Sequence, residues 1–289
     1  MWWTNSTFNY PNPSLRFSEG VCVQKYLGGD INLLQFEPSD LTIDEENGLL
    51  LVASLSEIVG IPDGMSTAEV DAKILYQAQN QTFDFEAIEI IDGVLFAVSE
   101  GSQVSDIVVF GKELDGRLVP TSIYHADTPN TEGMAYISSP NWFVQPSLVL
   151  AGLSNSDKLR MSAYDFPLPN STLENPVTLQ AFRLNEKIFS TTLLDQKVAA
   201  MQYFEGLLYL LFDNAAVIRA FDSSGNIVQE TNLPIAVEGF EKQWEGMEFQ
   251  RKDGNLILHL ALDSPAQVWS LLLEENQGGA GWKLPSCAA

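Results

Sequence analysis

The chain has 289 residues, of which 45% are hydrophobic and 10% are aromatic, so it can bury a large core and is not a disordered acidic protein. Asp and Glu number 38 against 15 Lys and Arg, which gives a formal net charge of −23. This charge argues against nucleic acid and anionic membrane surfaces as partners and favours cations, although it also suits solubility in a salty or extracellular setting.

The N-terminal segment 1–20 is expected to be an extension outside the folded domain. It begins MWWTNSTFNY, whose aromatic residues could dock a protein partner or pack back onto the domain. It has neither the basic nor the apolar region of an intact signal peptide, and no apolar run in the chain approaches the roughly 20 residues that span a bilayer. The chain is therefore either cytoplasmic or a mature form without its leader.

Two cysteines, Cys22 and Cys287, stand near opposite ends of the chain. If the fold is a ring, the two ends meet, and these thiols could form a disulfide that pins the closure. Two separate free thiols are the alternative. The bridged form indicates an oxidising, extracytoplasmic location.

A similar hairpin sequence occurs five times along the chain. The copies are SDLTIDEENGLLLVAS from Ser39, FEAIEIIDGVLFAVSE from Phe85, TEGMAYISSPNWFVQPSLVLAGLSNSDKL from Thr131, AAMQYFEGLLYLLFDN from Ala199 and WEGMEFQRKDGNLILHLALDS from Trp244. One aligned position, occupied by Ser39, Glu86, Glu132, Ala199 and Glu245, recurs at intervals of 47, 46, 67 and 46 residues. Three intervals agree within one residue, which indicates an internal repeat. The long interval contains PLPNSTLENPVTLQAF and predicts an inserted loop or extra hairpin.

Each copy is predicted to form antiparallel strands. The apolar residues alternate with period two, and the pairs Asn47-Gly48, Asp92-Gly93 and Asp253-Gly254 predict tight hairpin turns. Third strands follow at DIVVFG, RMSAYDF, AVIRAFD and AQVWSLLL, and fourth strands at RLVPTSIYH and NIVQETNLP. Units of about 40–50 residues with four strands are typical of a β-propeller.

We therefore predict an all-β fold, a β-propeller of five four-stranded antiparallel blades. A sixth, degenerate blade stays open, whereas a β-sandwich would not explain the fixed period. EGVCVQKYLGG, ahead of the first copy, is expected to supply the outer strand of the last blade and so close the ring. The propeller then spans 21–275, between the extension 1–20 and a C-terminal tail at 276–289.

Carboxylates recur at two points of the hairpin. In a propeller blade the first strand lines the central channel, and the start of the first strand and the end of the second lie at the same face. Three acids head first strands and three end second strands, so we expect six carboxylates at one channel mouth: Glu86, Glu132, Glu245, Glu100, Asp213 and Asp263. Six carboxylates cannot all stay ionised there without a counter-charge.

A divalent cation is the interpretation we favour for this mouth. Ca²⁺ takes 6–8 oxygen ligands and tolerates irregular geometry. The alternatives are acids that cap the strand entries, and acids that are protonated or paired with lysine. Because Ser39 and Ala199 occupy the matching position in the first and fourth blades, a cation site would be lopsided.

Other polar residues fall in the predicted connections at the same face. His125 and Asp127, in YHADTPNTEGM, are weak catalytic candidates: His125 could act as a general acid or base, but an ordinary loop histidine is the more common case. Four basic residues could bind an anionic substrate group or, the interpretation we favour, neutralise neighbouring acids: Lys158, Arg160, Lys197 and Lys242.

The repeated sequences SDLTIDEENGLLLVAS, FEAIEIIDGVLFAVSE, TEGMAYI and WEGMEFQRKDGNLIL resemble the SdiA-regulated propellers and the related esterase-like-phytase domains, over residues 36–273. The resemblance implies an extracytoplasmic propeller with calcium at the acidic face, and an ester- or phosphoester-cleaving activity. The matching positions are Glu86, Glu132 and Glu245, with Glu100, Asp213 and Asp263. The lost acid of the fourth blade and the few basic residues depart from that pattern, and they weaken the case for catalysis more than for cation binding.

Two functions follow from the sequence. The first, slightly favoured because no nucleophile or general base stands out, is a binding or scaffold module that holds a divalent cation and meets a protein partner through a propeller face or the aromatic N-terminus. The second is a Ca²⁺-dependent phosphoesterase or esterase in which the metal polarises substrate and water. HExxH, P-loop, GxGxxG and G-x-S-x-G motifs are absent from the sequence.

Overall fold

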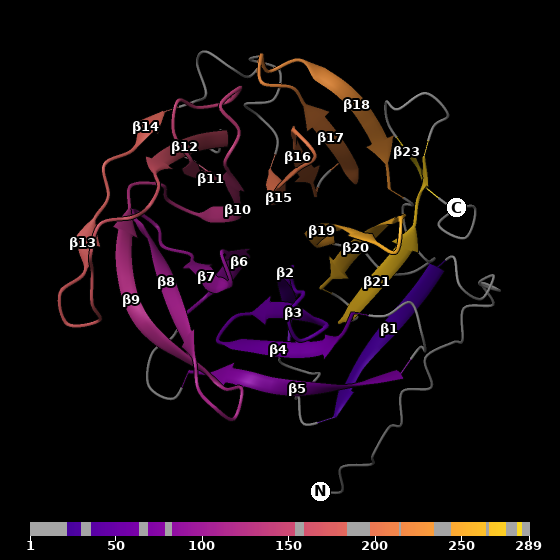
Figure 1. Cartoon of the computed structure of the whole chain (residues 1–289), viewed down its shortest axis with the longest axis horizontal. Coiled ribbons are helices and arrows are strands. Elements are labelled where there is room, and N and C mark those ends of the chain that lie inside the picture. The colour runs from indigo at the N-terminus through magenta and orange to yellow at the C-terminus, as the bar shows by residue number, and fades with distance from the viewer. Residues whose placement is uncertain are drawn as a thin grey trace, which may run out of the picture.

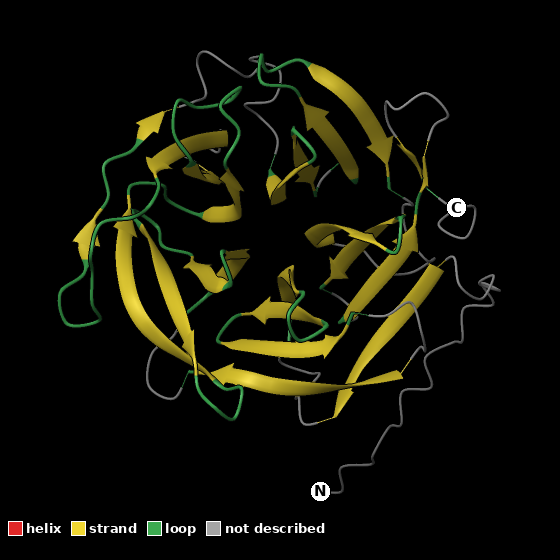
Figure 2. Ribbon diagram, in the orientation of Figure 1, coloured by secondary structure: helices red, strands yellow, loops and turns green. Residues whose placement is uncertain are grey.

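The sheets of the protein stand in a ring around a central axis (Figure 1). The computed structural model describes residues 22–29, 36–63, 69–78, 83–153, 159–183, 197–213, 215–233, 244–263, 266–275 and 282–284. Within these ranges the chain forms strands, turns and loops, with no helix (Figure 2). The prediction of an all-β, five-bladed β-propeller is confirmed, and the described strands leave none for a sixth blade.

The first three blades follow one another along the chain, and each is built outward from its inner strand. Blade 1 contains β2 (Pro38–Asp44), β3 (Leu49–Ser54), β4 (Glu57–Pro62) and β5 (Glu69–Gln77). Blade 2 contains β6 (Phe85–Ile91), β7 (Val94–Ser99), β8 (Ser105–Lys112) and β9 (Leu118–Ala126). Blade 3 contains β10 (Thr131–Ile137), β11 (Ser147–Leu153), β12 (Leu159–Asp165) and β14 (Phe182–Arg183).

The last two blades complete the ring. Blade 4 contains β15 (Val198–Phe204), β16 (Leu207–Phe212), β17 (Val217–Phe221) and β18 (Ile227–Asn232). Blade 5 contains β19 (Trp244–Lys252), β20 (Asn255–Leu262), β21 (Gln267–Leu272) and the N-terminal strand β1 (Cys22–Gly29). A further short pair joins β22 (Glu274–Glu275) to β23 (Trp282–Lys283).

The N-terminal strand closes the ring between the last blade and the first. β1 pairs antiparallel with β21, with Cys22 opposite Leu271, and its other end pairs parallel with β5. One continuous sheet therefore joins blades 5 and 1. Residues 1–21, 276–281 and 285–289 lie outside the described residues, so the bounds of the two tails and the Cys22–Cys287 bridge stay predictions.

The inserted segment extends blade 2 and does not form a hairpin of its own. Its strand β13 (Val177–Thr178) pairs parallel with the outer strand β9. Side-chain hydroxyls fasten it further: Ser171 Oγ donates to the Ile123 carbonyl at 2.6 Å, and Tyr124 Oη donates to the Pro169 carbonyl at 2.8 Å. The insert thus covers an edge whose backbone groups would otherwise be open to another chain.

Apolar side chains fill the space between neighbouring blades. Five clusters of buried residues occur, one at each interface; Trp244 and Tyr209, for example, belong to the cluster between blades 4 and 5, and Leu51 and Phe85 to the one between blades 1 and 2. This packing fixes the five inner strands side by side around the axis. No helix long and apolar enough to cross a membrane occurs in the described part of the chain.

A β-bulge recurs at the start of every inner strand. The register of each inner strand against its neighbour shifts across one residue, and that residue is the aligned repeat position: Ser39, Glu86, Glu132, Ala199 and Glu245. A bulge leaves its extra residue out of the ladder and re-aims its side chain. The five repeat positions therefore share one geometry at one end of the channel.

Candidate functional site

The bulge residues and the ends of the second strands form an acidic mouth around the axis. Glu86, Glu132 and Glu245 lie in the bulges, and Glu100, Asp213 and Asp263 directly follow β7, β16 and β20. These acids are close enough to act on one another electrostatically: Glu86 on Glu132, Glu100 and Glu245, and Glu245 on Asp213 and Asp263. The structure thus brings together all six acids that the sequence singled out.

Three carboxylates on the blade 2 side form a tighter group. One carboxylate oxygen from each of Asp84, Glu86 and Glu100 lies within 4.8 Å of the others. Two backbone contacts hold the group in place: the Asp84 N–H donates to Ser99 Oγ at 3.0 Å, and the Glu100 N–H donates to the Asp84 carbonyl at 2.7 Å. Asp84 Oδ1 is shielded from solvent and has no hydrogen-bond partner among the described residues. Such an oxygen suits a cation, because an unpaired buried acceptor is otherwise costly.

Lys197 supplies the positive charge on the other side of the mouth. Its Nζ lies 3.5 Å from Glu132 Oε1, and the carboxylates of Glu132, Glu245 and Asp213 raise its pKa against the effect of burial. Lys197 stands two residues before Ala199, the bulge position at which blade 4 lacks an acid. The basic residue therefore partly neutralises an acidic ring, and the arrangement is lopsided.

Burial is the main cause of the raised pKa values in the acidic mouth. Burial together with the neighbouring carboxylates raises the pKa of Glu86 to about 9. Burial raises the pKa of Glu245 to about 8 and that of Glu132 to about 7, while Lys197 opposes both shifts. Glu132 is only 8% exposed. Without a counter-ion these acids therefore hold protons near neutral pH. A bound cation would favour their ionised forms and offset the repulsion between the carboxylates.

The sequence analysis missed Asp84, although a signal for it exists. Asp84 precedes the bulge position by two residues, and polar residues occupy the equivalent place in every repeat: Glu37, Asp84, Asn130, Lys197 and Gln243. Because side chains alternate along a strand, a residue two before the bulge tends to point the same way as the acid in the bulge. Reading this column would have added Asp84.

His125 does not lie in a connection, and that expectation is wrong. It belongs to the outer strand β9, where its Nδ1 lies 2.7 Å from Asp106 Oδ1 on β8. Asp127 pairs with Arg160 at 2.7 Å. His125 is thus paired with a side chain of its own blade, and the Asp127–Arg160 ion pair joins blade 2 to blade 3. Lys158 and Lys242 lie outside the described residues.

A second set of polar residues lies inside the channel, and the sequence analysis missed it as well. Asp40 of β2 accepts a hydrogen bond from the Ile88 N–H of β6 at 3.0 Å. Gln202 of β15 exchanges two hydrogen bonds with the backbone of Phe249 in β19. These side chains thus satisfy backbone groups of neighbouring inner strands, because adjacent blades share no ladder there.

The inner strands also carry two acids, Glu89 and Glu248, at one position of the repeat. Glu89 and Glu248 stand three residues after the bulge in blades 2 and 5, where Gln202 stands in blade 4. Burial and the charge of Asp40 raise the pKa of Glu89 to about 8, and burial with Glu89 and Asp40 raises that of Glu248. Polar residues inside otherwise apolar strands are the signal that could have located them.

Comparison with known proteins supports the class that the fold defines, a β-propeller. No protein-family model matches the chain, and no curated protein matches it in sequence. Glutaminyl cyclase of Myxococcus xanthus superposes with a TM-score of 0.53 and 9% identity, over 88% of this chain and 98% of that one.

Two glycoside hydrolases give similar values. A GH43 β-xylosidase/α-arabinofuranosidase from a compost microbial metagenome, solved with xylotriose in a calcium-free form, has a TM-score of 0.53 and 10% identity, over 90% of this chain and 98% of that one. Exo-β-1,3-galactanase of Phanerochaete chrysosporium with galactose has a TM-score of 0.52 and 9% identity, over 87% and 63%. At such low identity the likeness shows the fold alone.

Proposed function

We propose that the protein is a binding module that holds a divalent cation, Ca²⁺, at the acidic mouth. The observation that carries the proposal is the group Asp84, Glu86 and Glu100, whose ligand oxygens lie within 4.8 Å of one another. One buried oxygen of Asp84 accepts no hydrogen bond from the part of the chain that the structure describes. Carboxylate oxygens are the ligands Ca²⁺ prefers, and it accepts an uneven set completed by water. Glu132, Glu245, Asp213 and Asp263 add negative potential around the ion.

The placement of the acids also bears on where the protein would act. A site with three clustered carboxylates at an open mouth is expected to bind Ca²⁺ weakly, in the range of about 10⁻⁴–10⁻³ M that is typical of extracellular modules. We therefore place the protein outside the cytoplasm, in agreement with its resemblance to the SdiA-regulated and phytase-like propellers. There it would act as a rigid scaffold for a protein partner.

Calorimetric titration with CaCl₂ tests the cation site. Glu86→Gln should weaken Ca²⁺ binding by about tenfold or more, because it removes a charge from the tight group. Glu37→Gln is the matched control: Glu37 is an exposed acid at the equivalent of position 84 in blade 1, outside the tight group. Equal losses in both variants would mean diffuse attraction without a site, and undiminished binding in Glu86→Gln would contradict the proposal.

One observation favours a second candidate, a Ca²⁺-dependent ester or phosphoester hydrolase. Glu132 is almost fully buried, its pKa is about 7, and Lys197 lies beside it, so it can exchange a proton near neutral pH next to the proposed ion. Assays with p-nitrophenyl phosphate and p-nitrophenyl acetate, with and without Ca²⁺, separate the two functions. Ca²⁺-dependent turnover that disappears in Glu132→Gln would establish the hydrolase, whereas Ca²⁺ binding without turnover would support the binding module.

A further inference from the structure

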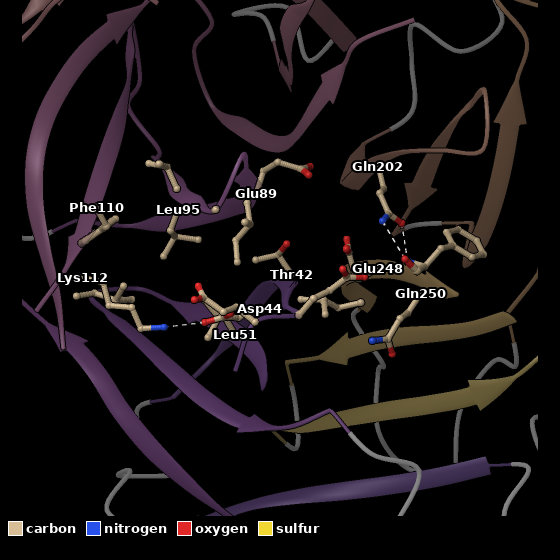
Figure 3. Close-up of a pocket in the computed structure, with 18 of the residues that line it drawn as sticks. Thr42, Asp44, Leu51, Glu89, Leu95, Phe110, Lys112, Gln202, Glu248 and Gln250 are labelled. Carbon is tan, nitrogen blue, oxygen red and sulfur yellow. Dashed lines mark hydrogen bonds and ion pairs between the residues drawn. The ribbon is translucent and has the colours of Figure 1, made fainter. Parts of the chain in front are cut away.

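The end of the channel opposite the acidic mouth opens into a separate cavity, here called the turn-side cavity. It has a volume of about 650 Å³ and is bordered by hairpin-turn residues such as Glu45 and Gly93. This volume is within the usual range of small-molecule sites. Figure 3 shows Phe110, Leu95 and Leu51 at one end of the cavity and Gln202, Glu248 and Gln250 at the other, with Glu89 and Thr42 between them.

Two acids, Glu89 and Glu248, line the middle of the cavity, and no basic residue in the described part of the chain acts on them. The two basic residues in the lining are engaged elsewhere: Lys112 lies 3.0 Å from Asp44 and Arg251 lies 2.7 Å from Glu205. Among the described residues, none donates a hydrogen bond to the Glu248 carboxyl.

A third acid, Asp40, acts on these two acids from behind the lining of the cavity. It is 2% exposed and interacts electrostatically with Glu89 and Glu248. Its Oδ2 accepts the Ile88 N–H, and its buried Oδ1 has no partner of good hydrogen-bond geometry among the described residues. Natural proteins leave few buried acceptors unpaired, since each one costs roughly 1–3 kcal/mol. These three acids are therefore shielded from water, unlike acids on an exposed surface.

A bare metal ion does not fit this cavity as well as an organic cation does. A metal requires ligand atoms gathered in one shell, and in the described part of the chain only the group at the acidic mouth meets that condition. The turn-side cavity instead places its acids beside an apolar wall of Leu51, Leu95 and Phe110, which are all at most 4% exposed. Carboxyl groups beside apolar side chains suit a molecule with an ammonium head, which favours the ionised carboxylates, and a hydrocarbon tail.

We propose that the turn-side cavity is a binding site for an amphipathic organic cation, with the ammonium group between Glu89 and Glu248 and the apolar part against Leu95 and Phe110. A cation there offsets the repulsion among the inner acids when they ionise, and the apolar tail of the ligand leaves water to contact the wall. This site is distinct from the acidic mouth and does not depend on the proposed Ca²⁺ site.

Titration calorimetry with n-hexylammonium, 1-hexanol and hexanoate tests this site. An alkylammonium keeps its charge at neutral pH, as the lysine amine does with a pKa of about 10.4. We expect one molecule of n-hexylammonium to bind per chain, at least about tenfold more tightly than 1-hexanol, and hexanoate not to bind. Equal binding of hexanol, or no binding of n-hexylammonium at millimolar concentration, would overturn the proposal.

Two variants locate the binding. Glu248→Gln should lose about tenfold in n-hexylammonium affinity, whereas Glu86→Gln at the acidic mouth should bind it like the unmodified protein while losing Ca²⁺. Unchanged affinity in Glu248→Gln, or loss in Glu86→Gln, would place the amine elsewhere and refute the site. Circular dichroism checks folding, and Glu89→Gln serves in place of Glu248→Gln should that variant not fold.

Discussion

Two carboxylates of this protein, Glu86 and Asp222, show how strongly position controls a single residue. Burial and four neighbouring acids raise the pKa of Glu86 to about 9. Asp222 is exposed in the β17–β18 turn, where hydrogen bonds from Asn226 and from the backbone of Ser224 and Gly225 lower its pKa. The chemical group is nearly the same, and the opposite shifts follow from desolvation in one case and donated N–H groups in the other.

Lys197→Met should strengthen Ca²⁺ binding at the acidic mouth by roughly fivefold at low salt. The substitution removes the positive charge beside Glu132 and keeps much of the side-chain volume, so the ion meets less repulsion. Calorimetry at two ionic strengths measures the change, which should shrink as salt is added. Lys112→Met, at the opposite end of the channel, is the control and should leave Ca²⁺ affinity unchanged; weaker Ca²⁺ binding in Lys197→Met would contradict the arrangement described here.

At the scale of elements, the β-bulge is the device that builds the mouth. Each bulge re-aims one side chain at the same height of the channel, whatever residue occupies it. The residue after the bulge must be small where inner strands come closest. A Cβ on Gly246 would lie 2.8 Å from the Cα of Asp40, and a Cβ on Gly133 would lie 3.0 Å from the Cβ of Met201.

Gly246→Ala should therefore destabilise the protein by about 1–3 kcal/mol, because β19 and β2 must separate to admit the methyl group. Chemical denaturation followed by tryptophan fluorescence measures the loss. Ala87→Gly is the matched control, since Ala87 follows the bulge in blade 2; it should cost only about 0.5–1 kcal/mol through backbone entropy. A Gly246→Ala protein as stable as the unmodified one would show that the inner strands are not in tight contact.

At the scale of the whole molecule, the ring concentrates charge that the chain carries far apart. Glu86 and Glu245 are separated by most of the sequence, and Glu245 still raises the pKa of Glu86 across the mouth. A closed ring cannot spread these acids without opening a blade interface. The repulsion is therefore stored in the native state and depends on pH and on bound cations.

Stability without Ca²⁺ should fall as the pH rises from about 6 to 9. The pKa of Glu132, Glu245 and Glu86 is about 7, 8 and 9 in the folded state, against 4.5 unfolded, so the folded protein binds more protons over this range. Stability then declines with pH between the unfolded and folded pKa values. Thermal unfolding in EDTA should show a drop of roughly 5 °C.

Added Ca²⁺ should remove much of that pH dependence, because an ion held by the ionised acids stabilises the state that high pH produces. Glu86→Gln in EDTA should make the decline shallower throughout and should nearly remove it between about pH 8 and 9, above the folded pKa values of Glu132 and Glu245. A melting temperature that stays level or rises with pH in EDTA would show that the folded state does not raise the pKa values of these acids.

Much of the fold could be predicted because it is written locally. The alternation of apolar residues, the Asp-Gly turns at Asp92-Gly93 and Asp253-Gly254, and the 46-residue interval each depend on neighbours in sequence, and the structure places positive φ angles at both residues of those two turns. The insert could not be placed, because β13 pairs with the preceding blade, a contact that no local pattern specifies.

The sequence predicted several acids of the candidate site, but it did not predict which side chains lie close together. Repeat alignment identified Glu86 and Glu100, whereas their partner Asp84 and the inner acids Asp40, Glu89 and Glu248 were missed. His125 ends the predicted strand RLVPTSIYH but was assigned to the connection that follows, whereas β9 continues to Ala126. Distances between side chains on different blades depend on how the blades pack, and that information is spread over the whole chain.

By itself the sequence determined that this is an acidic, repeated β-protein whose blades carry acids at matching positions, because strand period and turn chemistry are local. Only the tertiary structure decided that Asp84, Glu86 and Glu100 form one tight group, that Lys197 takes the opposite side, and that a separate cavity with its own acids lies at the other end of the channel. The physical reason is that charge interaction depends on distance through space, and closing the ring is what sets those distances.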